Sequence, residues 1–423
     1  MKFMLASYGS RGDVEPCAAV GRELLRRGHD VCIAVPPDLV GFAESVGLTA
    51  VAFGPNTRPW LDEHRDFFNR LFRNSWNIPD LIRSWREVWE PVAQCREEIR
   101  TTLTWQATGS DVLITGLVFE ETVANVAEYL DIPLATIHYF PARAHGQLFA
   151  NIPAPLARSA MTMYEWLTWR MGKKIDDAQR RELGLPEATR PSQRHITARG
   201  SLEVQAYDEV CFPGLATEWA KYDGQRPFVG ALMMDLPGDD DDEVASWIAA
   251  GTPPIYFGFG SIPVGSPADT VAMISAACAQ LGERALICAG WSDFTDIPYP
   301  DNVKIARTVN FSATFPACRA VVHHGAAGTA AAGFRAGVPQ LILWTWPDQS
   351  LWAAQVKRLK VGSGRRFSTT TQDSLVSDLR GILAAQYTAR ARELATRMTQ
   401  PAESVAAAAD LVESFAQSPR KGY

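Results

Sequence analysis

Short apolar runs alternate with amphipathic stretches along the first half of the chain. The apolar runs predict strands at residues 2–7, 30–36, 49–53, 111–115 and 134–138, and the stretch 15–27 has the spacing of a helix that Gly28 can end. Strands that alternate with helices form a parallel sheet with helices on both faces. The first half therefore predicts a doubly wound α/β domain.

The same alternation restarts in the second half. Strands are expected at residues 254–260, 284–289, 303–306, 320–323 and 340–344, with helices at 269–282, 329–336 and 350–359. This pattern predicts a second doubly wound domain. Residues 387–416 then form an amphipathic stretch with no strand behind it, so we expect a final helix that is free to return to the first domain.

A break in composition separates the two halves. Prolines and glycines are frequent between residues 212 and 238, and the acidic run 239–243 follows as a solvated hinge. A chain of 423 residues also exceeds the size of one hydrophobic core. We expect an N-terminal domain at 1–215, an interdomain linker at 216–242, a C-terminal domain at 243–385 and a C-terminal helix at 386–423 packed on the first domain. Such domains bind ligands outside the carboxyl ends of their strands.

Composition narrows the class of protein. Apolar residues make up 47% and charged residues 21%, as in ordinary soluble proteins, and the net charge of −6 gives no positive field for nucleic acid. The seven cysteines contain no CxxC pair, which favours reduced thiols. Because no signal-peptide core or membrane-spanning run is found, we expect a cytoplasmic protein, and peripheral association with the inner face of the plasma membrane stays open.

One loop has the composition of a diphosphate site. It follows an expected strand, precedes an expected helix and consists of His323, His324, Gly325, Ala326, Ala327, Gly328 and Thr329. Small residues at a helix start let backbone N–H groups approach an anion, and the helix dipole favours negative charge there. The alternative is a packed strand–helix turn with buried histidines.

Three further loops follow expected strands. Asp348 and Gln349 offer a carboxylate and an amide for sugar hydroxyls, or else cap the next helix. Ser261 can reach a β-phosphate or end a plain turn, and Trp291 can border the nucleotide or belong to the core.

The segment from Gly9 to Asp13 is expected to form a tight loop after the first strand. Its carboxylate, Asp13, can act as a general base towards an acceptor hydroxyl, and helix capping is the alternative. The loop lacks the G-x-G-x-x-G spacing of a dinucleotide site, which argues against a dehydrogenase.

No metal site is expected. The Asp-x-Asp within residues 239–242 lies in the linker with no strand before it, so the positive charge opposite a diphosphate falls to N–H groups, the helix dipole and His323. The stretch 59–89 is rich in Trp, Phe and Arg and is read as a helical excursion. It fits a lipid-like ligand near anionic headgroups, with ordinary core packing as the alternative.

With these loops in view, the sequence resembles the bacterial branch of the family-1 glycosyltransferases, which includes glycopeptide-antibiotic, macrolide and sterol glycosyltransferases. Residues 9–16 resemble the N-terminal signature of that branch, and residues 323–349 resemble its donor-binding signature. Residues 1–36, 201–230 and 246–290 are also similar to mycobacterial enzymes that add deoxysugars to glycopeptidolipids.

The resemblance implies a GT-B fold, in which two Rossmann-like domains face a central cleft, and inversion at the anomeric carbon without a metal or other cofactor. It implies that domain 1–215 binds the acceptor and domain 243–385 the nucleotide sugar. By motif match, Asp13 is the catalytic base, Ser10 and Gly12 lie beside the diphosphate, residues 323–329 hold the phosphates, and Asp348 with Gln349 contact the sugar.

This chain departs from the family pattern in the donor loop. The family commonly has a second glycine where Ala326 stands and a threonine where Ala330 stands. A methyl group at a backbone–phosphate contact can obstruct the ligand or demand a different dihedral angle, so a weaker or altered donor preference is expected.

The leading hypothesis is transfer of a hexose or deoxyhexose, such as rhamnose or 6-deoxytalose, from a dTDP- or UDP-sugar to a hydroxyl of a hydrophobic peptide or lipid acceptor such as a glycopeptidolipid. A natural-product or sterol glycosyltransferase is the nearest alternative. A nucleotide-sugar 2-epimerase and a non-catalytic sugar-nucleotide binder are the alternatives from other classes.

Overall fold

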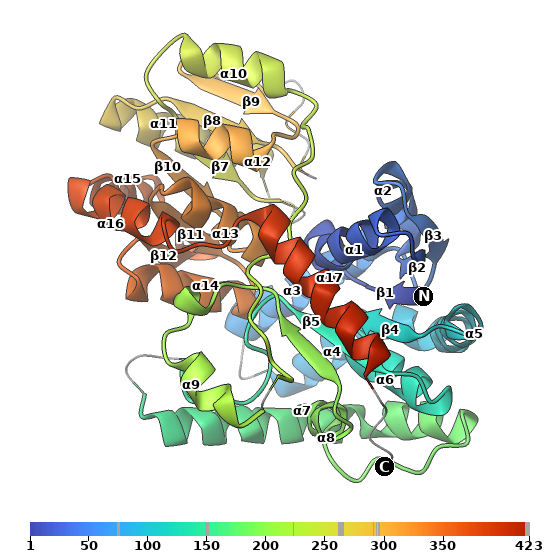
Figure 1. Ribbon diagram of the computed structural model, residues 1–423. Coiled ribbons are helices and arrows are strands. Elements are labelled where there is room, and N and C mark those ends of the chain that lie inside the picture. The colour runs from blue at the N-terminus through green and yellow to red at the C-terminus, as the bar shows by residue number, and fades with distance from the viewer. Residues whose placement is uncertain are drawn as a thin grey trace. The chain divides into compact units, whose positions relative to one another are not determined.

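The computed structural model describes residues 1–73, 77–148, 152–222, 224–260, 266–290, 292, 294 and 297–418. The chain forms two compact units, one of Met1–Met233 with Gln400–Tyr423 and one of Met234–Thr399 (Figure 1). All seven cysteines are free thiols. Among the described residues, no helix is long and apolar enough to cross a membrane.

The first unit is built on a six-stranded sheet in the order β3-β2-β1-β4-β5-β6, and every pair of neighbours is parallel. Apolar residues such as Phe3, Leu5 and Ile114 are fully buried, as expected where helices cover both faces. The strands are β1 (Lys2–Ala6), β2 (Asp30–Val35), β3 (Thr49–Ala52), β4 (Val112–Thr115), β5 (Leu134–His138) and β6 (Leu202–Gln205). The α-helices are α1 (Arg11–Arg26), α2 (Val40–Ser45), α3 (Thr57–Arg73), α4 (Ile78–Gln94), α5 (Arg96–Ala107), α6 (Glu120–Tyr129), α7 (Ala154–Glu182), α8 (Ser192–Ala198), α9 (Leu215–Trp219) and α17 (Pro401–Gln417).

The second unit repeats this architecture with a parallel sheet in the order β12-β11-β10-β7-β8-β9. Counted from its own first strand, β7, the order is the same as in the first unit. The strands are β7 (Ile255–Gly258), β8 (Ala285–Cys288), β9 (Val303–Ala306), β10 (Ala320–His323), β11 (Gln340–Trp344) and β12 (Gly362–Arg366). The α-helices are α10 (Asp241–Ala249), α11 (Pro267–Leu281), α12 (Phe311–Thr314), α13 (Ala327–Ala336), α14 (Pro347–Arg358), α15 (Gln372–Ile382) and α16 (Ala385–Ala395). The expected doubly wound α/β class is confirmed in both units.

The last part of the chain differs from the expected single helix. It consists of α16, which belongs to the second unit, and α17, which belongs to the first. Pro401 starts α17 at a position where a missing N–H costs nothing, so the chain bends before it. Helix α17 is tied to α1 of its own unit because Arg27 donates to both Asp410, at 2.6 Å, and Glu413, at 2.5 Å.

The acidic run is not the solvated hinge that we expected. Helix α10 begins at Asp241, and the carboxylate of Asp240 accepts the N–H of Arg307 at 2.5 Å. The Asp241 carboxylate accepts the N–H groups of Gly238 and Asn310, each at 2.7 Å. These side chains therefore fix the start of the second unit, and among the described residues no cluster of three His, Cys, Asp or Glu forms a metal site.

Candidate functional site

The two sheets each have a topological switch point, where neighbouring strands send their connections in opposite directions. These points lie between β1 and β4 in the first unit and between β7 and β10 in the second. In doubly wound sheets, ligands bind at the carboxyl ends of the strands at such a point. The loops after these four strands are therefore the candidate ligand-binding loops.

Asp13 lies at the switch point of the first sheet. Its backbone carbonyl accepts the hydroxyl of Ser7, which directly follows β1, at 2.9 Å. A Cβ atom on Gly116, which directly follows β4, would lie 3.1 Å from that same hydroxyl. The two strand ends and the first turn of α1 are thus packed tightly around Asp13.

The segment expected as a loop is already helical at Arg11, so Gly12 and Asp13 lie in the first turn of α1. Ser10 is the N-cap, and its N–H and hydroxyl both donate to Oδ2 of Asp13, at 2.6 and 2.8 Å. The capping interpretation of Asp13 is therefore correct as a description of its contacts. The second carboxylate oxygen of Asp13, Oδ1, takes no part in this cap.

Tyr139 completes this group and was missed in the sequence. It directly follows β5, and its hydroxyl donates to Oδ1 of Asp13 at 2.5 Å. Burial raises the pKa of Asp13 above its ordinary value, and the hydrogen bonds from Tyr139 and Ser10 only partly offset this rise. A carboxylate with a raised pKa is a stronger base than an exposed one. The available signal was that Tyr139 follows a strand on the same sheet edge.

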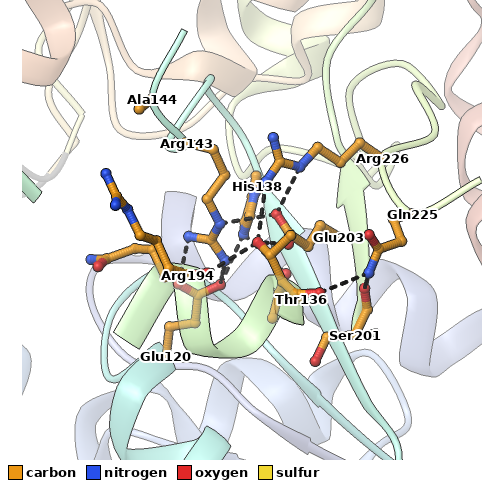
Figure 2. Close-up of polar contacts among 12 residues, drawn as sticks. Glu120, Thr136, His138, Arg143, Ala144, Arg194, Ser201, Glu203, Gln225 and Arg226 are labelled. Atoms are coloured by element: carbon orange, nitrogen blue, oxygen red, sulfur yellow. Dashed lines mark hydrogen bonds and ion pairs between the residues drawn. The ribbon is translucent and has the colours of Figure 1, made fainter. Parts of the chain in front are cut away.

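Buried charges pair with His138 and Arg143, which lie on either side of Tyr139 in the sequence (Figure 2). The Arg143 guanidinium donates to both oxygens of Glu120, at 2.9 and 2.6 Å, and to Glu203 at 2.9 Å. Burial alone would raise the pKa of Glu120, but Arg143 and His138 lower it to about 2. Arg226 also donates to Glu203, at 3.1 Å. The loop around Tyr139 is therefore held by paired charges and not by apolar packing alone.

In the second unit, His323 supports the donor loop from inside. Its side chain is fully buried, its Nδ1 accepts the N–H of Gly325 at 3.1 Å, and its Nε2 lies 2.9 Å from the side-chain oxygen Oε1 of Gln340. Burial lowers the pKa of His323 to about 3, so the ring is neutral. Both ring nitrogens have partners within the protein, where His323 holds Gly325 in place, and the positive charge expected from His323 towards a diphosphate stays a prediction.

Gly325 and Gly260 give this loop its shape. Gly325 has φ +101°, and a Cβ atom there would lie 2.8 Å from the Ile342 side chain. Gly260, which follows β7, has φ +61°, and a Cβ atom there would lie 2.5 Å from Cε1 of His324. The imidazole of His324 therefore occupies the switch point between β7 and β10. Burial lowers the pKa of His324 to about 4, and among the described residues its Nδ1 has no hydrogen-bond partner.

The start of α13 presents backbone N–H groups. Ala326 is the N-cap, with φ −61° and ψ 141°, and Ala327, Gly328 and Thr329 form the first turn. N–H groups of a first turn have no carbonyl partner within their helix, and an alanine side chain cannot cap them. Since Ala326 has an ordinary extended backbone, its methyl group demands no unusual dihedral angle.

Two protein families match parts of this chain. The model of the glycosyltransferase family 28 N-terminal domain matches residues 3–144, and that of the erythromycin biosynthesis protein CIII-like C-terminal domain matches residues 289–413. An uncharacterized glycosyltransferase of Mycobacterium bovis is 60% identical over 99% of this chain and 100% of its own length. The chain belongs to the glycosyltransferases.

Solved structures of glycosyltransferases share the fold. The kitacinnamycin glycosyltransferase has a TM-score of 0.68 and 18% identity over 98% of both chains. A spinosyn rhamnosyltransferase complexed with thymidine diphosphate has a TM-score of 0.64 and 18% identity, covering 98% of this chain and 100% of its own. The expected GT-B fold is confirmed.

Within this glycosyltransferase, the two predicted sugar-binding residues lie at the start of a helix. Asp348 and Gln349 both lie in the first turn of α14, not in a loop before it. The side-chain oxygen of Gln349 accepts the N–H groups of Thr345 and Trp346, at 2.8 and 3.1 Å, and the residue is buried. Gln349 therefore shapes the loop after β11, and contact of Asp348 and Gln349 with the sugar stays a prediction.

Ser261 and Trp291 lie outside the described residues, as does Trp76 in the aromatic excursion. The excursion forms α3 and α4, where Trp60 and Phe67 are buried and their rings contact Trp89 and Trp85. Core packing is thus the main role of the described aromatic side chains in this segment.

Proposed function

We propose that the protein is an inverting, metal-independent glycosyltransferase that needs no cofactor. It transfers a hexose or deoxyhexose from a dTDP- or UDP-sugar to a hydroxyl of a hydrophobic acceptor, a glycopeptidolipid or a similar lipopeptide. The reaction belongs to the synthesis of cell-envelope glycolipids and takes place in the cytoplasm or at the inner face of the membrane. Nucleic acid has no part in it.

The single observation that carries this proposal is the environment of Asp13. Its carboxylate lies at a switch point, is held by Ser10 on one oxygen and by Tyr139 on the other, and has a raised pKa. These features fit a general base that takes the proton of an acceptor hydroxyl. Helix capping alone requires neither the tyrosine nor burial.

The second unit supports assignment of the nucleotide sugar to residues 323–329. The N–H groups that start α13, together with the helix dipole, can bind the diphosphate and meet the charge that grows on it as it leaves. His323 contributes by holding Gly325, and Asp348 is assigned to the hydroxyls of the sugar.

The proposed step is a direct displacement. The acceptor oxygen forms a bond to the anomeric carbon, its proton goes to Asp13, and the bond from that carbon to the diphosphate oxygen breaks. The nucleoside diphosphate leaves with the bonding electron pair, and the configuration at the anomeric carbon is inverted. No metal or covalent enzyme intermediate is needed to balance the reaction.

The donor and the acceptor are each supported by a separate observation. The thymidine diphosphate complex of the spinosyn rhamnosyltransferase makes a dTDP-deoxysugar our first choice of donor. A partly exposed aromatic ring in the loop after β4 supports an apolar acceptor, namely Phe119, which contacts the ring of Tyr8.

A transfer screen tests the proposal. The wild-type protein is incubated with dTDP- and UDP-sugars and a panel of lipopeptide, sterol and soluble natural-product acceptors, and products are detected by mass spectrometry. We expect one added sugar on a lipopeptide, and nucleotide release only when that acceptor is present. Release without any acceptor would favour the 2-epimerase, and donor binding with neither transfer nor hydrolysis would favour a non-catalytic binder.

A further inference from the structure

Helix α7 has its polar and apolar sides reversed. Four polar or charged residues of this 29-residue helix are buried, namely Glu165, Asp176, Gln179 and Arg180. Large apolar residues on the outer side are between 48% and 69% exposed: Leu156, Met163, Tyr164, Trp166, Leu167, Met171 and Ile175. A helix that faces water normally shows the opposite arrangement.

The buried polar residues are firmly paired, so the helix cannot simply be rotated. Glu165 accepts the N–H of Ala144 at 2.9 Å, Asp176 accepts the amide of Asn125 at 2.8 Å, and Arg180 donates to Glu128 at 2.9 Å. Turning the apolar side inwards would break these hydrogen bonds and leave charges unpaired. The apolar side is therefore fixed outwards by the fold.

The exposed side chains form one continuous face. Leu156, Met163, Leu167 and Met171 follow at spacings of seven, four and four residues, which places them on one side of a helix. We call this the α7 face. Figure 1 shows α7 in green as the long helix of the first unit, with the short helix α8 against part of it.

Positive charge accompanies the α7 face. Residues 154–175 contain four basic residues, of which Arg158 and Lys173 pair with Glu218 and Asp177. The acidic residue of this stretch, Glu165, is buried on the opposite side. Arg170 and Lys174 are exposed on the same turns as Leu167 and Met171. Neither has an ion-pair partner among the described residues. A long apolar face with aromatic rings and unpaired cations is the pattern of a helix that lies in a membrane interface.

We propose that the α7 face binds the surface of an anionic lipid bilayer, with the helix lying parallel to the membrane. Leu167, Met171 and their neighbours enter the boundary between headgroups and acyl chains, while Arg170 and Lys174 contact lipid phosphates. A second copy of the chain fits less well, because a two-fold contact through this face would bring its cations towards each other or onto apolar side chains. This inference goes beyond sugar transfer and does not depend on it.

Vesicle flotation of the full chain tests the inference. We expect the wild-type protein to float with vesicles that contain phosphatidylglycerol, and to float less with phosphatidylcholine alone. The double variant Leu167→Gln/Met171→Gln is expected to bind about tenfold more weakly, and Arg170→Glu/Lys174→Glu is expected to lose the preference for anionic lipid.

Matched controls change exposed residues elsewhere. Trp105→Ser removes an aromatic ring that is 78% exposed on α5, and Lys357→Glu/Arg380→Glu reverses two exposed charges of the second unit. Both controls should float like the wild type. Thermal melting and binding of dTDP should be the same in all four variants, which shows that they are folded.

Three results would overturn the inference. The first is a wild-type protein that floats with neither type of vesicle, and the second is a Leu167→Gln/Met171→Gln variant that floats as well as the wild type. The third is a wild-type dimer in light scattering that this variant converts to a monomer, without vesicle binding by either. Transfer of sugar to a water-soluble acceptor is followed in parallel, so failure of flotation and failure of the proposed function are distinguished.

Discussion

At the scale of single residues, the chemistry depends on how a few side chains are held. Asp13 is positioned by its own helix through Ser10 and by a strand-end tyrosine that is distant in sequence. In the second unit, a neutral His323 holds a glycine whose backbone angle other residues avoid. The first arrangement tunes a base, and the second shapes an anion site.

Tyr139→Phe should change the pH dependence of transfer. The Tyr139 hydrogen bond lowers the pKa of Asp13, so its removal raises that pKa further. Because a general base must be ionised, the acidic limb of the kcat/KM profile should move to higher pH. Tyr129→Phe, at an exposed position of α6, is the matched control and should leave the profile unchanged. An unmoved limb in Tyr139→Phe would show that the hydrogen bond does not tune the base.

Gly325→Ala should abolish tight binding of the nucleoside diphosphate. At φ +101° an alanine is strained by about 1–3 kcal/mol, and its methyl group would meet Ile342 at 2.8 Å. The matched control is Gly282→Ala at the end of α11, where φ is +70° and nothing lies within 4 Å of the added Cβ atom. Calorimetric titration with dTDP measures both. Equal affinities in Gly325→Ala and the wild type would contradict the assignment of the donor loop.

At the scale of elements, the sequence predicted most strands because each is a short run of apolar residues buried on both faces. Strands β6 and β12 were missed, because Leu202–Gln205 contains a glutamate and a glutamine and Gly362–Arg366 contains two glycines and two arginines. Helix α7 was not among the expected elements, and the outward direction of its apolar face could not be read from the sequence. Tyr139 could not be paired with Asp13 from sequence, because that contact requires β5 and α1 to be brought together in the fold.

Arg143→Met tests the buried charges under the Tyr139 loop. Its removal leaves the carboxylates of Glu120 and Glu203 buried with fewer partners, which should lower the free energy of unfolding by about 3–5 kcal/mol. Adding Glu120→Met should restore part of the loss. Arg390→Met breaks an exposed pair with Glu393 and should cost at most about 0.5 kcal/mol. Urea unfolding followed by circular dichroism compares them, and an Arg143→Met variant as stable as the control would refute the structural role of the network.

At the scale of the whole molecule, two units with the same strand order carry different chemistry at their switch points. The first presents a carboxylate with a raised pKa, and the second presents helix N–H groups beside a glycine turn. The doubly wound class could be predicted for both because it follows from alternation of strands and helices. The roles of the histidines could not, since the lowered pKa of His323 depends on its burial and on the neighbouring His324.

Transfer by Asp13→Asn, measured beside donor binding, tests the central claim most directly. Asparagine keeps the shape of the side chain but cannot take up the acceptor proton. We predict that the variant binds dTDP as tightly as the wild type in calorimetric titration and that its kcat for transfer falls by about 10²–10⁴-fold. Transfer at the wild-type rate would contradict the assignment of Asp13 as the catalytic base.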